Sequence, residues 1–157
     1  MRFLRILILL SPLLVNSVNG KTFGEEITEF SFMLQPSTAP WGIGIFAAHK
    51  ISTGAIIHFF PDGYEPRILH KKDIPEDFLK YCTAQSDDEW KCPHRFDHME
   101  IVWYINHANS PNLKRIGRGK FIVIRDIKKG EEVTMDYNEL GEPEHLKQDY
   151  YKRDADL

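Results

Sequence analysis

A polar segment in the second half of the chain, "YINHANSPNLKR" at residues 104–115, holds residue types suited to binding a ligand. Asn106 and His107 follow the apolar run "IVWYI", so we expect both side chains to be partly buried. A buried Asn needs up to four hydrogen bonds and a buried His needs two. An adenosine or an amino acid would supply such partners, and so would the neighbouring backbone in an ordinary polar turn. The segment alone leaves both interpretations open.

Two other segments are equally ambiguous when each is considered alone. "WGIG" at 41–44 is a Gly-x-Gly turn whose backbone can approach a bound molecule closely, although it lacks the rest of a dinucleotide-binding fingerprint. "EEVTMDY" at 131–137 predicts a strand with Val133, Met135 and Tyr137 on one face. A core tyrosine whose hydroxyl bonds to a carbonyl would give the same pattern.

Together and in this order, the three segments resemble the SET-domain protein-lysine methyltransferases. That family has a Gly-x-Gly near its start, then a segment like "RFINHSCxPN", then one like "GEELTxDY". Here they read "WGIGIFAAHKISTGAII", "VWYINHANSPN" and "KGEEVTMDYNE". The resemblance covers residues 27–138 and implies a mainly β, SET-domain (β-clip-like) fold. Such a fold has short strands, one or two short helices and a knot-like C-terminal threading of the last segment beside the middle one.

The resemblance also implies a cofactor, S-adenosyl-L-methionine, and residues that hold it. The backbone around Trp41, Gly42 and Gly44 would hold its methionine part. Asn106 and His107 would bind its adenosine through side-chain amide and main-chain contacts.

Tyr137 would be the catalytic tyrosine at the junction of the cofactor pocket and the lysine channel, and Tyr104 would line the same cavity. Methyl transfer from a sulfonium is an in-line displacement, which depends on positioning and electrostatics and requires no metal. The expected partner is a protein or peptide that presents a lysine. The alternative is a catalytically inactive module that keeps the fold and binds a protein or peptide.

Several residues depart from the family pattern. Ala108 and Asn109 stand where the family usually has Ser and Cys, and that Cys often belongs to a zinc site completed after the domain. No cysteine follows Cys92, so we expect no such cysteine-rich segment. The tail containing Tyr150 and Tyr151 is a candidate to close the lysine channel instead.

Length and charge fit one ordinary globular domain. The chain has 157 residues, 42% of them hydrophobic and 27% charged, with a net charge of -3. This charge gives no reason to expect direct nucleic-acid binding. A small basic cluster predicts either a solvated hairpin surface or a site for a polyanion or acidic partner: Lys114, Arg115, Arg118 and Lys120.

Residues 1–20, "MRFLRILILLSPLLVNSVNG", are typical of a signal peptide, with two Arg before an apolar run and small residues after it. A secretory or extracellular location follows, with no stable membrane span once the leader is removed. A mitochondrial presequence is the alternative, or a nuclear or cytoplasmic location if the leader is not functional. Cys82 and Cys92 fit secretion if they pair, whereas zinc with His94 and His98 lacks the usual ligand spacing.

Between the site segments we expect short strands joined by turns. The first ends at Pro36, two more flank a turn at 52–54, and "KFIVIRDI" and "EEVTMDY" form others. Regular structure also resumes at "EIVWYI". Residues 66–99 should form an inserted helix and loop region. In it "KKDIPEDFLKYC" predicts a short helix capped by Asp73, followed by an irregular loop. Residues 139–157 form a charged, weakly helical tail.

Overall fold

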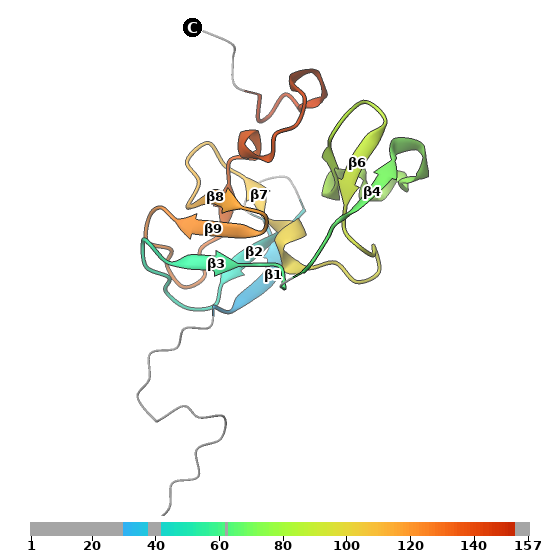
Figure 1. Ribbon diagram of the computed structural model, residues 1–157. Helices are drawn as coiled ribbons and strands as arrows, with labels where there is room; N and C mark the ends of the chain where they lie inside the picture. The colour runs from blue at the N-terminus through green and yellow to red at the C-terminus, as the bar shows by residue number, and fades with distance from the viewer. Residues whose placement is uncertain (1–29, 38–41, 62, 153–157) are drawn as a thin grey trace, which may run out of the picture.

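We describe a computed structural model of the chain, which defines residues 30–37, 42–61 and 63–152. Short strands dominate this part, as expected (Figure 1). The strands are β1 (Phe32–Pro36), β2 (Ile43–Ala47), β3 (Ile56–His58), β4 (Arg67–His70), β5 (Thr83–Ala84), β6 (Glu89–Cys92), β7 (Asn106–His107), β8 (Leu113–Gly117), β9 (Lys120–Val123) and β10 (Thr134–Met135).

The main body consists of two small antiparallel sheets and one parallel pair. β1 pairs with β2, and β9 lies between β3 and β8. The turn between β2 and β3 has Gly54 at φ 86°, a conformation that glycine adopts without strain. The core between these strands is aliphatic and aromatic: Ile45, Ala47, Ile51, Ile57, Ile105, Leu113, Phe121, Val123, Ile127, Val133 and Met135.

The parallel pair joins the two polar segments that the sequence singled out. β7 and β10 pair with Asn106 opposite Thr134 and His107 opposite Met135. The Ala108 N–H continues the ladder by donating to the Met135 carbonyl at 3.0 Å. The middle and last segments therefore lie side by side, as the family resemblance implied.

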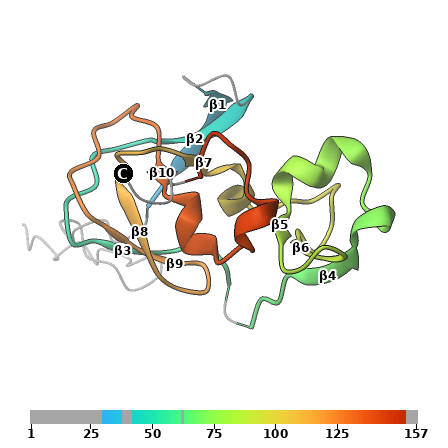
Figure 2. The same cartoon turned by 90° about the horizontal axis from the view of Figure 1, so that it is seen from above.

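The region at 66–99 forms a second lobe with a sheet of its own, which corrects the expectation of an irregular loop. β6 is the central strand, with β4 on one side and β5 on the other. Figures 1 and 2 show this lobe beside the main body, with the C-terminal segment passing between them in Figure 2. Along β6, Trp90 and Cys92 are buried, Glu89 is exposed and Lys91 is half-buried. This alternation stabilises a two-sided strand.

All the helices of the described residues are short 3₁₀-helices, more of them than expected. The predicted helix divides in two, and Asp73 ends the first piece rather than capping a helix. The second begins after Pro75, with no side-chain cap. The apolar run before Asn106 is also a 3₁₀-helix. They are η1 (Lys71–Asp73), η2 (Glu76–Tyr81), η3 (Ile101–Tyr104), η4 (Tyr137–Leu140) and η5 (Glu144–Leu146).

The expected leader at 1–20 lies outside the described residues. Within the described ranges, none of the helices has the length and apolar character needed to cross a bilayer. Cys82 and Cys92 are free thiols, one just before β5 and the other at the end of β6. The Cys82 thiol donates to the Phe78 carbonyl and the Cys92 thiol to the Trp90 carbonyl. The neighbouring Cys92 thiol, together with burial, raises the pKa of Cys82.

Candidate functional site

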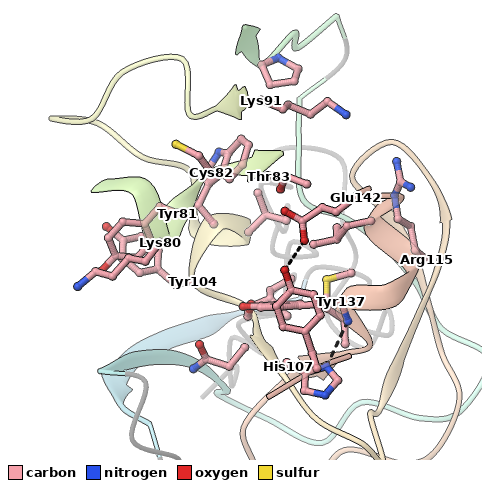
Figure 3. A pocket seen from close by; sticks show the side chains of 18 of the residues that line it. Lys80, Tyr81, Cys82, Thr83, Lys91, Tyr104, His107, Arg115, Tyr137 and Glu142 are labelled. Atoms are coloured by element: carbon pink, nitrogen blue, oxygen red, sulfur yellow. Dashed lines mark hydrogen bonds between the residues drawn. The ribbon is translucent and has the colours of Figure 1, made fainter. Parts of the chain in front are cut away.

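A cavity of about 690 Å³ lies between the main body and the second lobe, within the size range of small-molecule sites (Figure 3). Its wall contains residues from both lobes and from the C-terminal tail. Five of the residues that the sequence assigned to the site lie in this wall: Gly42, Tyr104, Asn106, His107 and Tyr137. Trp41 lies outside the described residues.

Asn106 is held by two acceptors on the side of its amide nitrogen. The nitrogen donates to the Ile43 carbonyl at 3.2 Å and to Glu132 Oε1 at 2.8 Å. Because both partners are acceptors, they fix the orientation of the amide and use both of its N–H groups. The side chain is buried, and no described residue donates to its oxygen. Asn106 therefore offers a ligand an acceptor.

His107 uses both ring nitrogens inside the protein. Its Nδ1 accepts from the Tyr137 backbone N–H at 3.2 Å, and its Nε2 lies 3.1 Å from Asn109 Oδ1. Because Nδ1 is an acceptor, the ring proton is on Nε2 and donates to Asn109. The ring therefore positions the main chain of Tyr137. Because both ring nitrogens have partners, His107 can make polar contacts with a ligand through its main chain.

Tyr137 is fixed at both ends. Its backbone N–H donates to His107, and its hydroxyl donates to the Ile105 carbonyl at 2.8 Å. Burial, followed by the nearby Tyr150 and Tyr151, raises the pKa of Tyr137 well above its usual range. The hydroxyl is therefore a neutral hydrogen-bond donor at any physiological pH.

Gly44 allows Asn106 and Glu132 to pack directly against the β2 backbone. A Cβ at position 44 would lie 2.1 Å from Glu132 Oε1 and 2.9 Å from the Asn106 amide nitrogen. The Gly44 backbone is thus part of the support for Asn106. Gly42 instead has φ 93°, and a Cβ there would meet nothing within 4 Å. Its role is conformational, because other residues adopt this φ only with strain.

Asn112 is a structural residue that sequence reasoning missed. It is fully buried, its amide nitrogen donates to the Glu132 carbonyl at 2.8 Å, and its oxygen accepts from the Thr134 N–H at 2.9 Å. Asn112 therefore takes the place of a backbone partner and fastens the 106–112 segment to β10. The Pro-Asn pair at the end of "NHANSPN" was the feature of the sequence that could have drawn attention to Asn112.

The C-terminal tail closes part of the cavity. Tyr151 is buried, and its hydroxyl donates to Glu142 Oε2 at 2.6 Å. Glu142 Oε1 accepts from the Ala84 N–H at 2.8 Å, so this carboxylate links the tail to β5 of the second lobe. The Tyr151 ring also packs edge-on against Tyr137, with the centroids 5.4 Å apart. The expectation that this tail covers the site gains support from these contacts.

Tyr104 packs against the second lobe in the wall of the cavity. Its ring packs edge-on against Tyr81, with centroids 5.4 Å apart. Burial and the neighbouring Tyr81 raise the pKa of Tyr104. The two rings form an aromatic wall that is separate from the Tyr137–Tyr151 pair. Across the described ranges, no three His, Cys, Asp or Glu side chains are grouped to hold a metal ion.

Comparison with known proteins identifies the family. A family model described as "SET domain" matches residues 42–138, which is more than half of the chain. No curated protein sequence matches at a significant level.

Solved structures of Chaetomium thermophilum Polycomb Repressive Complex 2 share the fold. One, an apo form with two mutations in Ezh2, is 24% identical with a TM-score of 0.52, and the match covers 72% of this chain and 15% of that chain. Another, bound to GSK126, is 23% identical with a TM-score of 0.50, and the match covers 69% and 16%. This chain thus spans about one sixth of their length. The match to the family model and the fold agree: the chain belongs to the SET domain family.

Proposed function

We propose that this protein transfers a methyl group from S-adenosylmethionine to a lysine side chain of a protein substrate. One observation carries the proposal: the β7–β10 pairing brings Asn106, His107 and Tyr137 into the wall of one cavity. Membership of the SET domain family supports it, because the resemblance assigned these residue types to cofactor binding and catalysis.

The residues of the cavity fit this cofactor. Asn106 presents its amide oxygen, an acceptor for an adenosine amino group. Position 44 must be glycine to keep this arrangement, because a Cβ there would collide with Glu132 and with the Asn106 amide. Gly42 brings uncovered backbone to the same wall. When bound, S-adenosylmethionine would supply an electrophilic methyl group on a positively charged sulfur.

The protein must also supply a neutral lysine. With a reference pKa near 10.4, only about one lysine in a few thousand is neutral at pH 7. The wall contains aromatic and aliphatic residues that disfavour the charged amine and lower its pKa: Tyr81, Val102, Tyr104, Phe121 and Leu140. The Tyr137 hydroxyl and the Ile105 carbonyl give the amine polar groups by which it is oriented.

Tyr137 has the properties that this role requires. Its hydroxyl stays protonated because burial raises its pKa, so no negative charge competes with the substrate for solvation or protons. Its backbone cannot shift without breaking the bond to His107. Fixed dipoles of this kind stabilise a transition state without the cost of reorganising at the moment of reaction.

The experiment is transfer of a labelled methyl group from S-adenosylmethionine to lysine-containing proteins and peptides, together with calorimetric binding of the cofactor. The proposal predicts label on lysine and saturable cofactor binding. If the cofactor does not bind and a protein partner does, the chain is the non-catalytic module instead.

A further inference from the structure

The charge of the cavity wall has the opposite sign to that of the chain. The chain carries a net charge of -3. Among the described residues of the cavity wall, the charged ones are nevertheless the four cations Lys80, Lys91, Arg115 and Arg118 and one carboxylate, Glu142. Each oxygen of that carboxylate accepts one hydrogen bond within the protein, from a backbone N–H and from a tyrosine hydroxyl, and the four cations still outnumber it.

Three of these cations gather on one side. Lys91 comes from β6 of the second lobe, Arg115 from β8, and Arg118 from the turn after it. Figure 3 shows Lys91 and Arg115 on the same side of the cavity, and Lys80 on the other. Burial, and then the charges of Arg115 and Arg118, lower the pKa of Lys91. Like charges held this close repel one another, and a bound anion relieves the repulsion.

Carboxylates compensate the positive charge of this group only in part. Glu139 Oε2 accepts from the Arg115 backbone N–H at 2.8 Å, not from the Arg115 guanidinium. In the described part of the chain, no carboxylate lies within ion-pair distance of Lys91 or Arg115. The Arg115 guanidinium donates to a carbonyl, that of Glu139, at 3.0 Å. Arg118 pairs with Glu65, but both side chains are mostly exposed. A surface pair of this kind is weak and exchanges readily for another partner.

The direction of the side chains separates this group from the rest of the basic cluster in the sequence. Along β8, Lys114 and Ile116 are exposed, whereas the intervening Arg115 lies in the cavity wall. Trp90 is also in the wall, and its buried indole N–H has no acceptor among the described residues. That N–H has no exposed surface in the cavity, so it is the positive charge that this part of the wall offers a ligand.

We infer that Lys91, Arg115 and Arg118 form a subsite for an acidic residue of the substrate, so that the protein selects lysines flanked by Asp or Glu. The inference rests on the proposed function, because a lysine entering this cavity carries its flanking residues past the three cations. A peptide fits better than a nucleic acid, since the net negative charge of the chain opposes long-range attraction of a polyanion.

The test measures peptide binding to the full chain by fluorescence anisotropy. Three labelled peptides share one central lysine and differ only in their flanks, which are Glu, Gln or Lys. We expect the Glu peptide to bind about tenfold more tightly than the Gln peptide at low salt, and the Lys peptide to bind most weakly. Added salt should reduce the difference.

Charge-reversal variants locate the subsite. Lys91→Glu should remove the preference for Glu flanks, and Arg118→Glu should weaken it. Lys114→Glu is the matched control, because it makes the same charge change on the outward face of β8. Lys91→Gln should lose part of the preference for Glu flanks. It keeps the test valid if Lys91→Glu does not fold.

Binding and transfer separate the two proposals. A Glu preference that Lys91→Glu removes, without methyl transfer to any peptide, supports the subsite and contradicts the proposed function. Transfer to all three peptides with equal affinity overturns the subsite and leaves the proposed function standing. Equal effects of Lys91→Glu and Lys114→Glu, or tighter binding of a single-stranded oligonucleotide, also overturn it.

Discussion

The Tyr137 hydroxyl donates a 2.8 Å hydrogen bond to the backbone carbonyl of Ile105, 32 residues earlier in the chain. Ile105 immediately precedes β7, and Tyr137 follows β10. The bond therefore spans the parallel pair and closes it on the cavity side, while the Tyr137 N–H bonds back to His107. The candidate catalytic residue is fixed by the same strand pairing that places the candidate cofactor residues.

Gly44→Ala should abolish or greatly weaken cofactor binding. The added methyl would lie 2.1 Å from Glu132 Oε1 and displace the group that holds the Asn106 amide. Asn106→Ala should weaken binding by about tenfold, because it removes one buried acceptor for the ligand. Calorimetric titration with S-adenosylmethionine measures both.

Gly54→Ala is the control for these variants. It adds the same methyl at a turn glycine with nothing within 4 Å, so it costs stability through its φ of 86° alone. Cofactor affinity equal to wild type in Gly44→Ala would show that the β2 backbone does not support the binding site.

Asn112→Ala should lower the free energy of unfolding by about 3 kcal/mol, because it leaves a buried N–H and a buried carbonyl without partners. Urea denaturation of the full chain measures the change. Ser110→Ala removes an exposed hydroxyl from the same loop and should cost less than about 1 kcal/mol. Similar losses for the two variants would contradict the role assigned to Asn112.

Tyr151→Ala should lower the free energy of unfolding by about 3 kcal/mol and slow methyl transfer, because a buried ring of the cavity wall is lost. Tyr151→Phe keeps the ring and loses the bond to Glu142, so its stability should fall by about 2 kcal/mol, with the cavity still covered. Thermal unfolding and transfer assays compare the variants. Full activity in Tyr151→Ala would mean that the tail does not complete the site.

Alkaline pH should destabilise the protein through its buried tyrosines. Burial raises the pKa of Tyr137, and burial with the bond to Glu142 raises that of Tyr151. The folded state keeps protons that the unfolded chain releases above about pH 10. This contribution to stability is therefore full below that pH and is lost as the pH rises through the folded pKa.

Tyrosinate absorbance recorded together with urea denaturation tests the pH dependence. Part of the absorbance should appear only as the protein unfolds. Titration of every tyrosine near pH 10, with the fold intact, would contradict the burial of these hydroxyls.

The sequence predicted the site better than the second lobe. The three polar and glycine-rich segments were recognisable because they keep family residues, and five of the assigned residues share one cavity wall. Burial of Asn106 followed from the apolar run before it, although that run forms a 3₁₀-helix. Tertiary packing determines the backbone conformation of this run, and a local sequence pattern does not contain that information.

The second lobe was mispredicted because its strands are short and its polar residues are many. β5 has two residues, too few for a periodic signal. β6 reads "EWKC", and its alternation of polar Glu89 and Lys91 with buried Trp90 and Cys92 was a signal that the polar surroundings obscured. The grouping of Lys91 with Arg115 and Arg118 could not be predicted from the sequence for another reason. Lys91 and Arg115 are far apart in sequence, and the packing of the two lobes brings them together.

The most direct measurement is the rate of methyl transfer by Tyr137→Phe at saturating S-adenosylmethionine, with cofactor affinity measured in parallel. Tyr64→Phe is the matched control, because the partly buried hydroxyl of Tyr64 bonds to Glu100 and this residue lies outside the cavity wall. The account predicts that Tyr137→Phe slows transfer about a hundredfold or more while Tyr64→Phe stays near wild type. Wild-type rates for Tyr137→Phe, with cofactor bound, would contradict it.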